Sequence, residues 1–220
     1  PDHFCLLNKF NVVDHHLLIV TREFHAQDEP LTTVDFAAAD YCLRACERAG
    51  LDGLAFYNGG RAAGASQPHK HLQVMPIRRA ASGARMPIER WLELDAAVAA
   101  AGRFSALPFM HRIKWSGSPG NSAVTTSPEL LADWYRNVVA EFRRELGYPE
   151  SLPALPYNLL WTRRWVLFVP RAAEQFEEIA LNSVAFAGGL FVRTAEQMRR
   201  VRQVGPIFLL SRVTFPWRPR

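Results

Sequence analysis

Cysteine is scarce in this 220-residue chain, which contains only Cys5, Cys42 and Cys46. An odd number of cysteines in a chain of this length argues against a disulfide framework and favours a reducing, cytoplasmic compartment. Cys42 and Cys46 lie four residues apart in an apolar stretch with helical spacing, so we expect both thiols in a hydrophobic core. Long hydrophobic runs are lacking as well, which excludes a membrane-spanning helix and predicts no membrane partner.

Lysine is nearly absent, since only Lys9, Lys70 and Lys114 are lysines among 26 basic residues. Arginine therefore carries the net charge of +5, and its planar side chain can bind phosphate through two hydrogen bonds. An anionic ligand and a GC-rich genome both explain this arginine bias, and the composition does not decide between them. Basic residues form no run of four or more, so the sequence predicts no nucleic-acid partner.

Hydrophobic residues make up 49% of the chain, which is sufficient for a globular core. Short apolar runs predict strands at 4–8, 16–21, 54–58, 69–77, 157–162 and 165–170, the first two joined as a hairpin. Helices are predicted at 87–101, from Thr32 with its capping partner Asp35 to Ala49, from Ser127 to Gly147, and from Thr194 to Val204. We expect an irregular segment at 103–126 and a loop with a strand at 180–193. This arrangement favours the α+β class.

The most informative segment is the fourth expected strand, because polar residues alternate along it. Side chains two positions apart in a strand point to the same face, so His69, His71 and Gln73 are predicted to share one face, about 7 Å apart. Leu72 and Val74 take the opposite face and are expected in the core. An apolar strand that places two histidines and a glutamine on one face departs from simple packing, and such departures favour a functional role.

Imidazole offers two chemistries at such a site, nucleophilic attack on phosphorus and metal coordination. A metal site would need a third ligand, but the next carboxylate along the chain is Glu89, and Gln73 is a poor zinc ligand. We therefore expect a catalytic nucleophile and no metal ion, with a metal site and structural histidines as the alternatives. Surface or packing positions are expected for four histidines without a motif, His15, His16, His25 and His111.

Small residues fill the loop before this strand, including Gly64, Ala65 and Ser66. Glycine lets the main chain approach a ligand closely, and clusters of backbone N–H groups bind phosphate oxygens. We expect this loop to hold a phosphate beside the histidine face. The hydroxyl of Ser66 and the loop N–H groups would then stabilise charge in a transition state.

Residues 64–73, with the sequence Gly-Ala-Ser-Gln-Pro-His-Lys-His-Leu-Gln, resemble the signature of diadenosine tetraphosphate phosphorylases, also called ATP adenylyltransferases, in the histidine-triad superfamily. Hydrolases of this superfamily carry His-x-His-x-His, whereas its nucleotidyltransferases carry His-x-His-x-Gln, as here. Segments 8–21 and 157–171 are similar to the family's first hairpin and C-terminal domain. The family's upstream segment has no counterpart here, so we expect N-terminal residues to be missing.

The resemblance implies a histidine-triad-like, mainly antiparallel sheet with flanking helices over residues 1–125. It also implies a C-terminal α+β domain over residues 126–220, packed on the first. The activity it implies is phosphorolysis of diadenosine tetraphosphate by inorganic phosphate, which yields ATP and ADP.

Particular residues acquire roles from this resemblance. His71 would attack the α-phosphorus and expel ATP, and phosphate would then release ADP from the adenylyl-histidine. Gln73 would donate a hydrogen bond to a phosphoryl oxygen, His69 would orient the neighbouring strand or a phosphate, and Ser66 would hold developing charge. The implied substrate-binding residues are Asn8, Lys9, Asn58, Gly64, Ala65 and Gln67.

Other functions stay open on the sequence: a nucleotide hydrolase, a sugar-1-phosphate nucleotidyltransferase, and a nucleotide-binding module without turnover. Gln73 argues against the first, the run Gly64–Gln67 against the second, and an intact His71 against the third. We expect no tightly bound cofactor, although Mg²⁺ commonly accompanies polyphosphates. The expected partners are diadenosine polyphosphates, ATP, ADP and inorganic phosphate, and the oligomeric state is open.

Overall fold

The computed structural model describes residues 2–77, 86–94, 101–115, 127–149, 151–152 and 154–217. Within these residues seven strands form one sheet in the order β1-β2-β4-β3-β6-β7-β5, and each neighbouring pair runs antiparallel. Their bounds are β1 (His3–Leu7), β2 (Leu17–Thr21), β3 (Asp52–Gly59), β4 (His71–Ile77), β5 (Arg112–Trp115), β6 (Tyr157–Trp161) and β7 (Trp165–Pro170). The predicted α+β fold with a mainly antiparallel sheet is confirmed. A small separate ribbon consists of β8 (Gln175–Phe176) and β9 (Ile179–Ala180).

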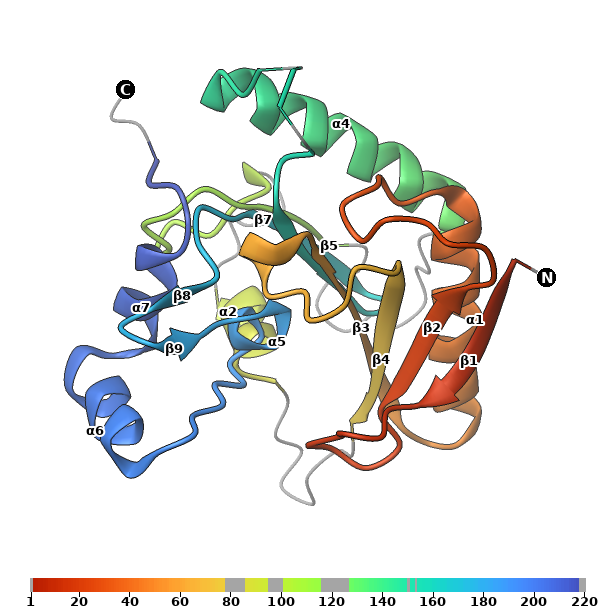
Figure 1. Cartoon of the computed structure of the whole chain (residues 1–220), viewed down its shortest axis with the longest axis horizontal. Helices are drawn as coiled ribbons and strands as arrows, with labels where there is room; N and C mark the ends of the chain where they lie inside the picture. The colour runs from red at the N-terminus through yellow and green to blue at the C-terminus, as the bar shows by residue number, and fades with distance from the viewer. Residues whose placement is uncertain are drawn as a thin grey trace.

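Helices cover both faces of the large sheet (Figure 1). One face carries α1 and α4, which pack against each other, and the other face carries α2, α5 and α7. The bounds are α1 (Thr33–Arg48), α2 (Pro87–Leu94), α4 (Pro128–Leu146), α5 (Ser183–Phe186), α6 (Ala195–Val204) and α7 (Pro206–Arg212), with a short 3₁₀ helix η1 (Arg61–Ala63). In the described part of the chain, no helix is long and apolar enough to cross a membrane.

The helices begin where the capping signals predict. The Thr32 hydroxyl accepts a hydrogen bond from the Asp35 N–H, and the Asp35 carboxylate accepts one from the Thr32 N–H at 2.7 Å. Ser127 and Thr194 cap α4 and α6 with their side-chain oxygens. At the other end, α4 stops at Gly147, whose φ of 61° suits glycine. These predictions are confirmed.

Alternation along the strands divides the core into two clusters, one on each face of the sheet. Leu72 and Val74 of β4 are fully buried under α1 and α4, as predicted. Cys42 and Cys46 of α1 belong to the same cluster, which confirms their predicted core positions. The opposite cluster lies under α2, α5 and α7 and includes Leu54, Phe56 and Met75. The face of this second cluster is also the face on which the candidate site lies.

The segment 103–126, expected to be irregular, contains the edge strand β5. Its residues Arg112 and Lys114 alternate with apolar ones, and this short pattern of four residues gave too little signal for a strand. The strand forms because β7 offers a free edge with which to pair. Residues 116–126 lie outside the described residues.

The segment 180–193 contains a one-turn helix, α5, where we expected a loop with a strand. The Asn182 carboxamide oxygen caps this turn by accepting from the Val184 N–H at 3.1 Å. The helix predicted at 87–101 is confirmed over the length of α2, and residues 95–100 lie outside the described residues.

One continuous sheet runs through both halves of the chain. β3 from the first half pairs with β6 from the second half, from Ala55 opposite Trp161 to Gly59 opposite Tyr157. Three further strand pairs lie on the β3 side of this junction and two lie on the β6 side. The division into segments 1–125 and 126–220 stays a prediction.

Candidate active site

His71 is the first residue of β4, and its side chain is held in a defined state. Its Nδ1 lies 2.9 Å from the His69 carbonyl oxygen, so Nδ1 carries a proton and donates it to that oxygen. The lone pair of Nε2 is therefore available for attack. Burial lowers the pKa of His71 below the usual value for histidine, against the opposing effect of this hydrogen bond, and the neighbouring His69 lowers it further. The ring is thus neutral and nucleophilic at neutral pH.

Gln73 points to the same face as His71. In the ladder between β2 and β4, Val20 lies opposite His71 and Leu18 lies opposite Gln73, and directly opposite residues share a face. Continuing this register by two residues brings His16 to the same face beside Gln73. The structure therefore brings His71 and Gln73 together, as predicted from the period of the strand, and adds His16.

His16 is buried and packs on the ring of Phe56, which agrees with the packing role that we expected, but its position beside Gln73 was not predicted. It is 9% exposed, and burial lowers its pKa, with the Gln73 side chain raising it and His71 lowering it. Its Nδ1 lies 3.3 Å from the Asn8 amide nitrogen. The sequence does indicate that His16 shares a face with Leu18 and Val20, because the three lie two residues apart. It does not give the register of β2 against β4, which brings that face beside Gln73.

His69 does not belong to the strand, which corrects the expected start of β4. It forms an isolated bridge with Ala26, and its Nε2 lies 3.0 Å from the Thr21 hydroxyl and 3.2 Å from the Glu23 carbonyl oxygen. Its ring also contacts that of Phe24, with centroids 5.4 Å apart. His69 therefore binds the end of β2, and its carbonyl orients the ring of His71. Its role towards a phosphate stays a prediction.

The loop after β3 forms η1, and this changes the expected phosphate cradle. The N–H groups of Ala63, Gly64 and Ala65 already donate to carbonyl oxygens of residues 60 and 61, so these three are occupied. The loop therefore has fewer free N–H groups than we expected, because a tight 3₁₀ turn closes its own hydrogen bonds. Substrate binding by Gly64 and Ala65 stays a prediction. Gly64 is required here for another reason: its φ is +88°, and a Cβ would lie 3.1 Å from Asn182.

Ser66 and Gln67 follow this turn and are exposed. Within the described ranges, their N–H groups have no acceptor in the protein. They line a cleft of about 550 Å³, which also contains Arg61, Phe24 and Glu174. The loop therefore offers a hydroxyl and two N–H groups for an anion, and the guanidinium of Arg61 at the cleft lies 4.0 Å from the Glu174 carboxylate.

Asn8 and Lys9 lie just after β1, near His16. The Asn8 carboxamide accepts from the Phe10 N–H at 3.0 Å, and the exposed Lys9 lies over the Phe10 ring, 5.7 Å from its centroid. The face of β1 and β2 that leads to His71 is apolar and partly open, and it carries Phe4, Leu6, Leu18 and Val20. A flat aromatic group could lie on this face with polar atoms near Asn8.

Asn58 has structural partners that the sequence did not reveal. Its Oδ1 accepts from the Asn158 amide at 2.9 Å and from the N–H and hydroxyl of Ser183 at 3.0 and 2.7 Å. Asn158 in turn binds Arg171, whose guanidinium is fully buried and donates to three backbone carbonyl oxygens. A substrate contact of Asn58 can come only through its amide nitrogen, and it stays a prediction.

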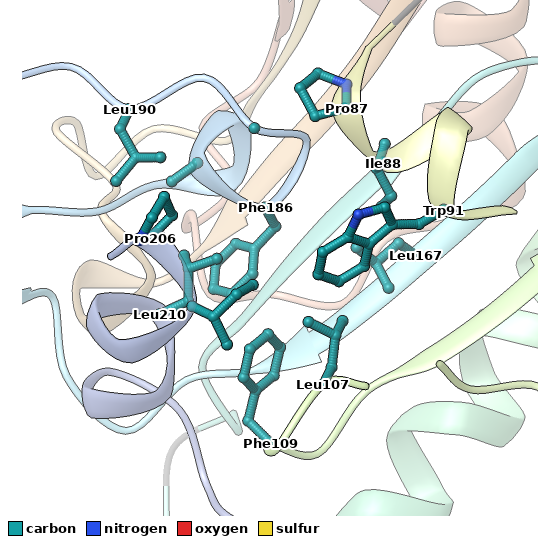
Figure 2. A pocket seen from close by; sticks show the side chains of 13 residues that line it. Pro87, Ile88, Trp91, Leu107, Phe109, Leu167, Phe186, Leu190, Pro206 and Leu210 are labelled. Atoms are coloured by element: carbon teal, nitrogen blue, oxygen red, sulfur yellow. The ribbon is translucent and has the colours of Figure 1, made fainter. Parts of the chain in front are cut away.

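Two further features bear on what the site can bind. In the described part of the chain, no cluster of three or more histidine, cysteine or acidic side chains could hold a metal ion. A separate cavity of about 370 Å³ lies among α2, α5 and α7, where Trp91, Phe109 and Phe186 point towards one another (Figure 2). Its lining is almost wholly apolar, so it does not suit a polyphosphate.

Comparisons with known proteins give a consistent result. Residues 1–94 match the family described as Ap4A phosphorylase N-terminal domain, and residues 105–216 match the ATP adenylyltransferase C-terminal domain. Two proteins of Saccharomyces cerevisiae (strain ATCC 204508 / S288c) are similar: Protein APA1, 29% identical over 208 residues, and diadenosine 5',5'''-P1,P4-tetraphosphate phosphorylase 2, 30% identical over 227 residues. Both alignments cover 90% of this chain but only 64% of the relative. The chain thus spans just under two thirds of their length.

The solved structures agree with this result. The crystal structure of yeast Ap4A phosphorylase Apa2 in complex with AMP has a TM-score of 0.78 and 28% identity, covering 98% of this chain and 74% of that one. The complex of the same enzyme with Ap4A gives a TM-score of 0.74 at 26% identity, with the same coverage. A uridylyltransferase, 16% identical with a TM-score of 0.51 over 94% of this chain and 85% of that one, shares the fold alone.

Proposed function

Because the chain belongs to the ATP adenylyltransferase family, we propose that it is a nucleotidyltransferase that phosphorolyses diadenosine tetraphosphate to ATP and ADP. The observation that carries this proposal is the state of His71: a neutral ring with Nδ1 bound to a carbonyl and Nε2 open, beside Gln73. Such a ring is a nucleophile towards phosphorus. The similarity to Ap4A phosphorylases supports the choice of substrate.

In the first step Nε2 of His71 attacks the α-phosphorus of one adenosine. An N–P bond forms, the bond from phosphorus to the bridging oxygen breaks, and ATP leaves with that oxygen and its electron pair. The Gln73 amide and the Ser66 hydroxyl donate hydrogen bonds to the non-bridging oxygens as their charge grows. The arginine at the cleft, Arg61, stabilises the departing polyphosphate.

In the second step an oxygen of inorganic phosphate attacks the same phosphorus. The N–P bond breaks, Nε2 of His71 recovers its lone pair, and ADP is released. Gln73 distinguishes this route from hydrolysis, because an amide can donate a hydrogen bond but cannot act as a general base for water at neutral pH.

The adenosine that becomes attached to His71 fits the apolar face of β1 and β2. The exposed side chains of Phe4 and Leu6 offer a surface for the base, and Asn8 offers an amide and a carbonyl oxygen to the ribose. In this proposal the cleft lined by Ser66 and Gln67 receives the leaving nucleotide. Lys9 supplies a cation near the phosphates.

The remaining partners and the compartment belong to the same proposal. ATP, ADP, inorganic phosphate and diadenosine polyphosphates are the proposed ligands, with Mg²⁺ entering only as a companion of the polyphosphate. Three unpaired thiols support a reducing, cytoplasmic compartment.

Incubation with diadenosine tetraphosphate, with and without phosphate, tests the proposal when the nucleotides are then separated by chromatography. ATP and ADP formed only with phosphate support phosphorolysis. ATP and AMP formed without phosphate would instead indicate a hydrolase, and unchanged substrate would indicate a binding module. A sugar-1-phosphate acceptor in place of phosphate distinguishes the remaining alternative.

A further inference from the structure

Gln27 lies between β2 and α1 and is only 4% exposed. Both polar atoms of its side chain form hydrogen bonds with main-chain groups of β3 and β4. Its Nε2 donates to the Asn58 carbonyl oxygen at 2.9 Å and to the His71 carbonyl oxygen at 3.2 Å. Its Oε1 accepts from the His71 N–H at 2.8 Å. The main chain of Gln27 is fixed as well, because its carbonyl accepts from the Tyr57 hydroxyl and its N–H donates to the Pro68 carbonyl.

The hydrogen bonds of Gln27 take the place of main-chain hydrogen bonds between β3 and β4. The last pair in the ladder between these strands is Phe56 opposite Gln73, so Asn58 would face His71 if the ladder continued. At that point the Gln27 carboxamide lies between the strands, because it binds the carbonyl of one and the N–H of the other. A carboxamide has the same donor and acceptor as a peptide group and can substitute for it. β4 is therefore held away from β3 at His71, while its other edge still pairs with β2.

We propose that Gln27 is a positioning residue for the nucleophile His71. The hydrogen bond to the His69 carbonyl fixes the imidazole relative to its own main chain, and Gln27 fixes that main chain relative to the sheet. Together these contacts set the direction of Nε2. The kinetic consequence rests on the proposed function, whereas the orientation of the ring can be measured without it. A displacement of about 1 Å at a reacting group can lower a rate by roughly 100-fold.

Three variants test the proposal. Gln27→Met keeps the length of the side chain and removes both hydrogen-bonding groups, and Gln27→Glu keeps an acceptor for the His71 N–H. Gln203→Met, on the exposed surface of α6, is the matched control. Per folded molecule, we expect Gln27→Met to lower kcat and the rate of adenylylation by roughly 10- to 100-fold. KM should change less than kcat, because the polar atoms of the Gln27 side chain bind main chain, although Gln27 also lines the cleft of Ser66 and Gln67. The control should keep the wild-type values.

Nuclear magnetic resonance of ¹⁵N-labelled histidine supplies a measurement that a merely structural role would not change. Among the residues that the structure describes, the titratable groups that interact with His71 are His16 on the β2 side and His69 before β4. Gln27→Glu adds a carboxylate there and should raise the pKa of His71, whereas Gln27→Met should weaken the Nδ1–H tautomer.

An unchanged kcat per folded molecule in Gln27→Met overturns the proposal, and so does an unchanged tautomer of His71. If the wild-type protein forms no adenylyl-histidine, the proposed function fails. The tautomer in Gln27→Met then still decides whether Gln27 positions His71.

Discussion

The contact made by Nδ1 of His71 determines what Nε2 of the same ring can do. A carbonyl oxygen can only accept, so the hydrogen bond to His69 selects one tautomer and leaves Nε2 as a base. Burial then keeps the ring neutral below the usual pKa of histidine. His69 contributes its main chain to this arrangement, and its own ring binds Thr21.

Labelled diadenosine tetraphosphate without phosphate should therefore leave adenylate on the protein through an acid-labile, alkali-stable N–P bond. We expect His71→Ala to lose both label and turnover, and His69→Ala to keep the label because its carbonyl remains. Since the pKa of His71 is lowered, the single-turnover labelling rate should fall with acid only below about pH 6.5. Label on the His71→Ala protein would rule out His71 as nucleophile, and the reverse pattern would assign His69.

At the scale of elements, the turn after β3 and the strand β4 place the reacting groups. The N–H groups of Gly64 and Ala65 donate to carbonyl oxygens within the turn of η1. Ser66 is therefore the first residue after this turn whose N–H group is available to a ligand. Its side chain is exposed and makes no contact that the fold depends on within the described residues.

Ser66→Ala should lower kcat by roughly 10- to 1,000-fold, the range for loss of one donor to a transition state. The melting temperature should stay the same, because the residue is exposed in a loop. Ser151→Ala, in another exposed turn, is a suitable control. Full activity of Ser66→Ala would show that the backbone N–H groups alone hold the phosphate.

A second element-scale feature joins β3, β6 and the C-terminal residues through Asn58, Asn158 and Arg171. Burial lowers the pKa of Arg171 to about 9, so this arginine still carries its charge at neutral pH. Backbone carbonyls and Asn158 stabilise the charge. Removing the guanidinium leaves these buried acceptors without donors.

Arg171→Met should reduce the free energy of unfolding by roughly 3 kcal/mol, measured by urea denaturation, because it leaves buried acceptors unsatisfied. The matched control, Arg136→Met, breaks an exposed ion pair with Asp133 and should cost less than about 1 kcal/mol. Equal losses in the two variants would contradict the structural role of Arg171.

The sequence predicts those parts of the site that depend on neighbouring residues, and it does not predict those that depend on contacts between distant segments. The shared face of His71 and Gln73 depends only on the period of a strand, and it was predictable. The place of His16 depends on how β2 is registered against β4, which no local pattern contains. The partners of Asn58 are set by contacts 100 residues away, and Gln27 acts through main-chain groups that any residue could supply. The helices were predictable because their caps are local.

At the scale of the whole molecule, buried histidines make the fold sensitive to acid. His111 is fully buried, where its Nε2 accepts from the Phe104 N–H and its Nδ1 binds the Phe109 carbonyl. Burial lowers its pKa to about 4. The unfolded chain takes up a proton near pH 6.5 and the folded chain does not, so stability falls as the pH drops from about 6.5 to about 4. This position confirms the expected packing role of His111.

Between pH 7 and pH 5, His111 alone should cost the wild-type protein about 2 kcal/mol of unfolding free energy. The variant His111→Gln keeps a donor and an acceptor at this position but cannot take up a proton. We expect it to be less stable at pH 7 and to lose about 2 kcal/mol less than the wild type on acidification, measured by urea unfolding at both values. Parallel losses would show that His111 does not contribute to the acid sensitivity.

The pairing of β3 with β6 has a consequence for how the protein is made. Asn58 and Asn158, which are bonded across these central strands, are 100 residues apart in the chain. A ribosome adds roughly 5–20 residues per second, so β3 waits about 5–20 seconds before β6 has been synthesised. During that time one edge of β3 has no partner and can pair with the strand of another nascent chain. A chaperone that covers the free edge of β3 during translation would prevent this pairing.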